Sequence, residues 1–179
     1  MNATSLITFL RIAGRLKRVK RTGWVEAGVP DPESVADHSY RVALISMVLA
    51  DSRSLDALKA VKMAILHDLP EVLTGDLTPE QKAINYAAAE AQAFQNAVAC
   101  LSEGQRKQYT ELFREYGAGD TPEAILVHTA DRLDMVIQAL EYEVEGVESS
   151  KLDRFWDVHI QKEYEALLSA LKKLRAGRV

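Results

Sequence analysis

Residues 64–76 read AILHDLPEVLTGD and place a histidine and an aspartate, His67 and Asp68, directly after an apolar run. An imidazole nitrogen beside a carboxylate oxygen offers two ligands for a divalent cation. Two more acids, Glu71 and Asp76, follow closely and can handle a proton near such an ion. The stretch therefore indicates a metal-dependent hydrolase.

Apolar side chains recur at helical spacing along most of the chain, and no alternating segment of strand length stands out. A loop with several Gly and Pro residues follows the first expected helix. Pro70 lacks a backbone donor and is expected to bend or end the third one, which puts His67 and Asp68 in its last turn. We expect an all-α fold, a single helical bundle in one domain. The expected helices cover residues 6–17, 34–50, 54–69, 78–100, 102–116, 121–145 and 153–174.

Two further polar residues lie on or beside apolar helix faces. His38, in the first turn of the second expected helix, shares a stripe with apolar residues that directs its imidazole toward the core. Asp131 lies beside the apolar stripe of the helix expected over residues 121–145. Buried carboxylates pay a heavy desolvation penalty unless they are paired or bound to a metal. Ion pairs with Arg41 or Arg132 are the structural alternative.

The order of these residues, H…HD…D, resembles that of the HD-domain metal-dependent phosphohydrolases. RTGW at 21–24, ESVADH at 33–38 and above all EVLTGD at 71–76 are similar to the 5′-deoxynucleotidase branch, which includes the HD domain-containing protein 2 family. The core motifs span residues 16–134, and the resemblance weakens in a helical C-terminal extension over residues 150–175. It implies one HD domain over the whole chain. It also implies a metal site with the ligands His38, His67, Asp68 and Asp131.

The types of ligand limit which metal ions can bind at this site. Two imidazoles and two carboxylates without sulfur suit one borderline divalent ion such as Mn²⁺, Co²⁺, Fe²⁺, Ni²⁺ or Zn²⁺. The other histidines, His128 and His159, do not form the adjacent pair that resemblance to two-metal HD enzymes would require. His128 lies almost one turn before Asp131, and we expect it to be a core or surface residue rather than a support for the ligands.

Glu71 and Asp76 are the catalytic candidates. Glu71 follows His67 by four residues and shares its face while the helix persists, so it can orient a water or accept its proton. Asp76 follows a glycine turn, and the resemblance implies a part in catalysis and substrate placement, here assigned to the sugar hydroxyl or the leaving oxygen. A surface acid and a cap of the next helix are the respective alternatives.

A dense basic run, KRVKR, occupies residues 17–21. A phosphomonoester needs positive charge, and Arg matches its oxygens with bidentate hydrogen bonds. Arg21 is the expected phosphate ligand, with Arg18 as the alternative. Trp24 resembles the tryptophan beside the sugar in the deoxynucleotidases, where its ring would exclude a ribose 2′-hydroxyl; a plain loop anchor is the alternative.

The length and net charge of the chain limit the classes of partner that we expect. The chain has 179 residues and a net charge of −4, which fits one globular domain without a general attraction to polyanions. We therefore expect a small nucleotide substrate, no long nucleic acid and no membrane partner. The single Cys100 suits a reducing cytoplasm. No apolar run approaches the length of a membrane span, and the N-terminus lacks a signal-peptide pattern, so we expect a cytoplasmic protein. The apolar helices make a homodimer the expected assembly.

These observations predict an enzyme that removes the 5′-phosphate from deoxyribonucleoside monophosphates. A different HD phosphohydrolase, acting on a cyclic nucleotide, an alarmone or a nucleoside triphosphate, is the first alternative. A non-enzymic, metal-stabilised interaction module is the second. The extra acids argue against the module, and a triphosphate would need more cations than the one basic run provides.

Overall fold

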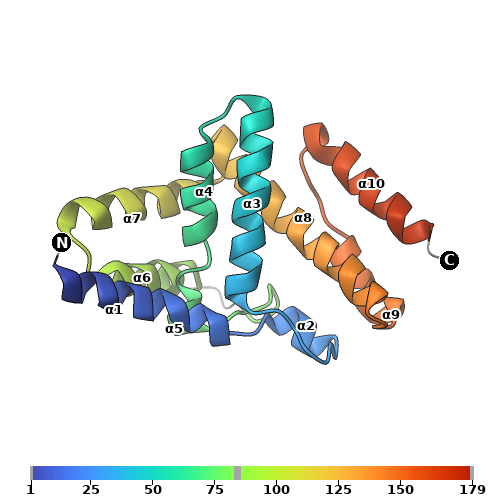
Figure 1. Ribbon diagram of the computed structural model, residues 1–179, viewed down its shortest axis with the longest axis horizontal. Helices are drawn as coiled ribbons and strands as arrows, with labels where there is room; N and C mark the ends of the chain where they lie inside the picture. Colours follow the sequence, from blue (N-terminus) through green and yellow to red (C-terminus); the bar gives the residue numbers. More distant parts are fainter. Residues whose placement is uncertain (1, 83–85, 178–179) are drawn as a thin grey trace.

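The computed structural model describes residues 2–82 and 86–177, and in these ranges every regular element is a helix (Figure 1). No β-strand occurs in them, and one isolated antiparallel bridge joins Lys20 to Ser34. The prediction of an all-α fold is confirmed. The elements are α1 (Ala3–Ala13), η1 (Gly14–Arg18), α2 (Thr22–Glu26), α3 (Val35–Arg53), α4 (Ala57–Leu66), α5 (Glu71–Thr74), α6 (Tyr86–Val98), α7 (Glu103–Ala118), α8 (Pro122–Val144), α9 (Ser149–Leu152), η2 (Asp153–Trp156), η3 (Lys162–Tyr164) and α10 (Glu165–Ala176).

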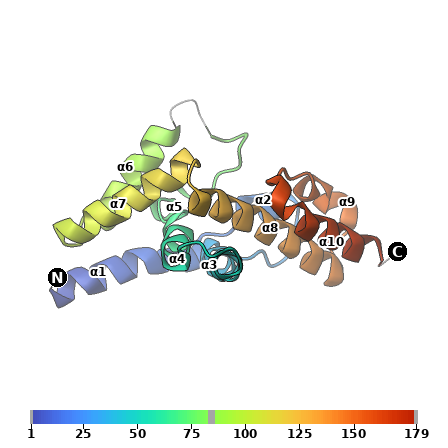
Figure 2. The ribbon, with the colours of Figure 1, turned by 90° about the horizontal axis from the view of Figure 1, so that it is seen from above.

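Three helices, α3, α4 and α8, form the centre of the molecule (Figure 1). Small buried residues such as Ala60, Ala64 and Ala130 let them approach closely. Helices α1, α6 and α7 lie on one side of this centre, while α2, α9 and α10 lie on the other (Figures 1 and 2). The two chain ends consequently lie at opposite ends of the molecule. None of the helices in the described ranges is long and apolar enough to cross a bilayer.

Capping residues fix where the two helices that bear ligand candidates begin. Ser34 caps α3, since its side chain accepts a hydrogen bond from the Asp37 amide while the Asp37 carboxylate accepts one from the Ser34 amide. Thr121 caps α8 with its side chain, which accepts a hydrogen bond from the Ala124 amide, and Pro122 occupies the first turn of the helix. Both boundaries agree with the sequence.

The third expected helix is shorter than predicted at both ends. Ser54 adopts a left-handed conformation (φ 55°) that ends α3, and Asp56 rather than Ser54 caps α4. Helix α4 ends at Leu66, and a turn leads into the short helix α5. Gly75, with φ 73° and ψ 166°, then sends the chain out of α5. His67 and Asp68 therefore lie just beyond a helix end.

Three other expectations need correction. The loop expected before α3 contains the short helix α2. The helix expected from residue 78 begins as α6 at Tyr86 in the described part, after a turn at residues 79–81; residues 83–85 lie outside the described ranges. The continuous helix expected over 153–174 is instead η2, an irregular stretch, η3 and α10. A straight helix would spread the buried side chains of residues 155–168 over more than half of its circumference, too wide for one face.

Candidate active site

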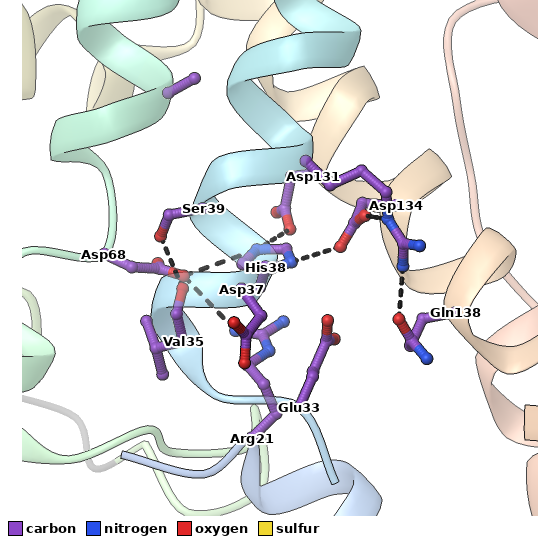
Figure 3. A network of polar contacts seen from close by, with 12 residues as sticks. Arg21, Glu33, Val35, Asp37, His38, Ser39, Asp68, Asp131, Asp134 and Gln138 are labelled. Carbon is purple, nitrogen blue, oxygen red and sulfur yellow. Dashed lines mark hydrogen bonds and ion pairs between the residues drawn. The ribbon is translucent and has the colours of Figure 1, made fainter. Parts of the chain in front are cut away.

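The structure brings the four ligand candidates to one point between α3, α4 and α8. Figure 3 shows three of them, His38, Asp68 and Asp131. The Nε2 atom of His38 lies 3.2 Å from Asp131 Oδ1 and 3.6 Å from Asp68 Oδ2. The Nε2 atom of His67 lies 3.1 Å from the same Asp68 oxygen. Two ring nitrogens and two carboxylates thus face one another.

Each histidine is held by its other ring nitrogen. His38 Nδ1 donates to Asp134 Oδ2 at 2.6 Å, and His67 Nδ1 donates to the carbonyl of Ala64 at 2.7 Å. Both Nε2 atoms are buried and find no hydrogen-bond partner among the described residues. With Nδ1 held as the donor, each ring can lose its Nε2 proton and turn a lone pair toward the acids, which is how a histidine binds a metal. The residues present therefore fit a divalent cation.

The charge balance agrees with this fit. Burial alone would raise the pKa of Asp131, but the nearby His38 and His67 lower it to about 2. The pKa of Asp68 also lies well below its usual range, because His67, Arg21 and His38 outweigh burial. The two carboxylates stay ionised at neutral pH. A cation that binds between them must displace the protons that they hold on the imidazoles.

Asp134 and Arg41 complete the site, and the sequence analysis did not assign them to it. Asp134 is fully buried, and its second oxygen accepts a hydrogen bond from Arg41 Nε. Arg41 also donates to Gln138 at 2.5 Å. Ion pairs of the ligand acids with Arg41 or Arg132 were the alternative prediction. Arg41 binds Asp134 instead, and Arg132 donates to the carbonyl of His159. The available signal was the position of Asp134, three residues after Asp131 on one helix.

Arg21 lies beside the ligands. Its Nη1 atom is 3.4 Å from Asp68 Oδ2 and 3.2 Å from Asp76 Oδ1. Burial disfavours the charge of Arg21, yet the adjacent carboxylates raise its pKa, so the side chain stays a cation. Arg18 is exposed and lines a separate depression with Arg11 and Arg15. Of the two phosphate candidates, the structure places Arg21 at the centre.

The two catalytic candidates lie in the same cavity. Glu71 is 6% exposed, and its Oε2 atom has no partner within the described chain, so it is not a surface acid. Burial, Asp68 and Asp76 raise the pKa of Glu71 to about 10. Among the described residues, the contacts of Asp76 are with the segment that contains α2. Its carboxylate accepts a hydrogen bond from the amide of Thr22, the first residue of α2, and contacts Arg21.

A cavity of about 760 Å³ opens from these residues and is large enough for a nucleotide. Trp24, which is 2% exposed, lies in its lining with Phe155. Tyr116 also lines it, with its ring edge-on to His67 at 5.4 Å. His128 stacks on Tyr116 at 4.1 Å, and its Nε2 atom hydrogen-bonds to the carbonyl of the same residue. These contacts fit the packing role predicted for His128.

Comparisons with known proteins point to one family. The model of the HD domain matches residues 13–171. The chain is 37% identical over 179 residues to human 5′-deoxynucleotidase HDDC2, an alignment that covers 98% of this chain and 87% of the human protein. It is also 37% identical to the protein of the same name from Dictyostelium discoideum, covering 94% and 95% of the two chains.

Solved structures agree with the fold. A conserved hypothetical protein from Pyrococcus furiosus superposes with a TM-score of 0.81 at 42% identity, covering 93% of this chain and 99% of that one. A protein from Pyrococcus horikoshii superposes with a TM-score of 0.80 at 38% identity, covering 94% and 99%. The helical extension is therefore shared by relatives of nearly the same length.

Proposed function

The chain belongs to the HD domain family, and from this premise we propose that it is a metal-dependent 5′-deoxynucleotidase, which hydrolyses a deoxyribonucleoside monophosphate to the deoxyribonucleoside and phosphate. One observation carries the proposal. Two buried, unpartnered histidine nitrogens face two ionised carboxylates in a nucleotide-sized cavity that also holds Arg21 and Glu71. The name shared by the relatives from human and Dictyostelium discoideum supports the choice of substrate.

We assign His38, His67, Asp68 and Asp131 to one divalent ion, of the group Mn²⁺, Co²⁺, Fe²⁺, Ni²⁺ and Zn²⁺. When bound, such an ion makes water more acidic and neutralises charge on a phosphoryl oxygen. Asp134 keeps the His38 ring oriented, and Arg41 holds Asp134 in turn.

Arg21 is assigned to the phosphate. Asp68 and Asp76 both contact its Nη1 atom, so the N–H groups of Nε and Nη2 remain to meet two non-bridging oxygens. Asp76 thereby acts on the phosphate through Arg21. Its predicted contact with the sugar hydroxyl or the leaving oxygen stays a prediction.

Glu71 is assigned to the attacking water. Without a cation, burial, Asp68 and Asp76 raise the pKa of Glu71 and keep it protonated; a divalent ion bound beside these acids would lower that pKa and leave a carboxylate that can take a proton from water. Water attacks phosphorus and gives a proton to Glu71, the bond from phosphorus to the 5′ oxygen breaks, and that oxygen takes up a proton from solvent as it leaves. The chain supplies a general base and a fixed cation for this step, and no covalent intermediate with the protein is needed.

Trp24 is assigned to the sugar. Its ring lies in the cavity lining close to Arg21, so a sugar attached to a phosphate bound there would come near the indole. A bulky ring in that place would leave no room for a 2′-hydroxyl. This assignment makes the enzyme selective for deoxyribonucleotides.

The assembly is proposed to be a homodimer in the cytoplasm. Helix α3 carries an exposed apolar stripe on one broad face of the molecule (Figure 2). Such a stripe suits an isologous contact with a second copy. The stripe consists of Tyr40, Leu44, Met47 and Val48. The lone Cys100 supports the location.

The test is phosphate release from matched ribo- and deoxyribonucleoside mono-, di- and triphosphates, with each of the five metals added to metal-free protein. We expect release from the deoxyribonucleoside monophosphates. Activity confined to triphosphates or cyclic nucleotides would support another HD phosphohydrolase, and a lack of activity with every metal would favour the non-enzymic module.

A further inference from the structure

Glu33 joins the segment that bears the proposed substrate residues to the start of α3. The backbone amide of Arg21 donates to the Glu33 carbonyl at 3.1 Å, and the amide of Val35 donates to the Val19 carbonyl at 2.8 Å. An antiparallel bridge between Lys20 and Ser34 lies between these bonds. The main chain of Glu33 therefore helps to fix Arg21 relative to the helix that carries His38.

The side chain of Glu33 reaches the other proposed substrate residue. Its Oε1 atom accepts a hydrogen bond from Trp24 Nε1 at 2.9 Å. Its amide donates to the Tyr142 hydroxyl at 2.7 Å, which anchors the residue on α8. Figure 3 shows the carboxylate directed toward His38 and Asp134, and a carboxylate oxygen lies within 4.8 Å of both.

Glu33, His38 and Asp134 do not form a second metal site. The Nδ1 atom of His38 is already bound to Asp134, and Asp134 is bound to Arg41. The partner that the structure gives to Glu33 is the indole N–H.

Packing alone leaves the orientation of the Trp24 ring open. The ring meets Phe155 at a centroid distance of 3.9 Å and Tyr142 edge-on at 5.3 Å. Such apolar contacts define a slot, but a ring turned over in the slot would still bury its surface. A buried indole N–H needs an acceptor, and one acceptor on one side selects one orientation.

We propose that Glu33 is a positioning residue for sugar discrimination, holding the Trp24 ring in the one orientation that closes the cavity to a ribose 2′-hydroxyl. The inference rests on the proposed function, because it presupposes that Trp24 faces the sugar. A ring displaced by a fraction of an ångström would readmit the hydroxyl, since steric discrimination depends steeply on position.

The test compares two substitutions at one position. Glu33→Gln keeps an acceptor oxygen, whereas Glu33→Leu removes it at similar size. With saturating metal, we measure kcat/KM for matched deoxyribo- and ribonucleoside monophosphates. We expect the deoxy:ribo ratio to fall at least fivefold in Glu33→Leu and to stay within twofold of wild type in Glu33→Gln. Glu145→Leu, at an exposed glutamate, is the matched control and should keep the wild-type ratio.

A second readout needs no activity. In a Trp156→Phe background Trp24 is the only tryptophan, and its quenching by acrylamide in metal-free protein reports how firmly the ring is held. We expect stronger quenching in Glu33→Leu and no change in Glu33→Gln. Trp24→Phe removes the donor instead of the acceptor and should lower the deoxy:ribo ratio even if Glu33→Leu fails to fold.

The outcomes separate the two proposals. A wild type without deoxy preference would contradict the proposed function, while unchanged quenching in Glu33→Leu would by itself contradict the positioning of Trp24. If the wild type prefers deoxyribonucleotides but the deoxy:ribo ratio of kcat/KM is unchanged in folded Glu33→Leu, or in Trp24→Phe, the inference is overturned. Equal loss of the ratio in Glu33→Gln and Glu33→Leu would overturn it as well, because an acceptor would then not suffice.

Discussion

Single side chains decide whether the cavity holds a cation. His67 presents a buried Nε2 atom to Asp68 and has no other partner for it in the described chain. His67→Ala should lower metal affinity by roughly 100-fold or more, and Asp68→Ala should do the same, since the remaining ligands leave a poorly filled site. Metal content after dialysis and phosphate release measure the loss. His159→Ala, at an exposed histidine, should behave as wild type. Full metal content in either ligand variant would refute the assignment.

A substitution at Glu71 tests the chemical step separately from metal and substrate binding. Glu71→Gln keeps the shape of the side chain but cannot accept a proton, so turnover should fall by about 10²- to 10⁴-fold. Metal content and KM should stay close to wild type, because the proposed role acts in the transition state. Steady-state kinetics beside metal analysis decide the question. A variant with wild-type turnover would make Glu71 a bystander.

Glu71 also makes the stability of the metal-free protein depend on pH. The pKa of Glu71 is raised to about 10 when folded, so folding takes up a proton at neutral pH. Its contribution to stability therefore falls as pH rises from about 5 to about 9, by at most about 1.4 kcal/mol for each pH unit. Glu71→Gln has no carboxyl group at this position, so it does not lose stability in this way as pH rises. Denaturant unfolding of both metal-free proteins should show the variant gaining relative stability with pH, and parallel curves would contradict the shift.

The proposed ligands could be picked out from the sequence, but the residues that hold them in place could not. H…HD…D is a pattern along the chain, whereas the bonds of Asp134 to His38 and Arg41 depend on how α3 crosses α8. The spacing of Glu33 and Trp24 says nothing of a hydrogen bond between them. Residues that act through another residue become visible only when helices distant in sequence are packed together.

Helix boundaries followed the sequence where capping was local. Ser34 and Thr121 begin their helices as predicted, because each cap involves residues only three positions apart. The C-terminal segment departed from prediction because Trp156, Ile160 and Tyr164 are buried by partners far away in the chain. Tertiary packing outweighed helical periodicity there.

Helix α3 gives a prediction about assembly. Tyr40 is 72% exposed and Val48 56% exposed on its outer stripe, while Val42 and Ala50 are buried inside. A charge on the outer stripe should disrupt a dimer without disturbing the core, so Val48→Glu should run as a monomer in sedimentation velocity. Asp51→Lys, also exposed on α3, should leave the assembly unchanged. A wild type that is monomeric at micromolar concentration would contradict the proposed dimer.

The molecule as a whole places its cavity between two apolar clusters. One joins α1, α5, α6 and α7, and the other joins α2 and α8 to the C-terminal segments. Trp24 belongs to the second cluster, in contact with Phe155. The C-terminal segments, which carry none of the ligand motifs, thus form one wall of the proposed sugar pocket.

Removal of the C-terminal segments should therefore unfold more than an extension. Each large apolar side chain contributes about 1.5–3 kcal/mol when buried, and a domain of this kind is stable by only about 5–15 kcal/mol. Leu152, Phe155, Trp156, Tyr164 and Leu168 would all leave the cluster in a chain ending at Val147.

We expect that shortened chain to lose its cooperative thermal transition and its protected Trp24, measured by circular dichroism and by quenching. A chain ending at Ala176, which keeps the whole cluster, is the control and should melt like wild type. If the chain ending at Val147 melted cooperatively at the wild-type temperature, the C-terminal helices would be a separable extension. The Trp24 slot would then have to be held by α8 and Glu33 alone.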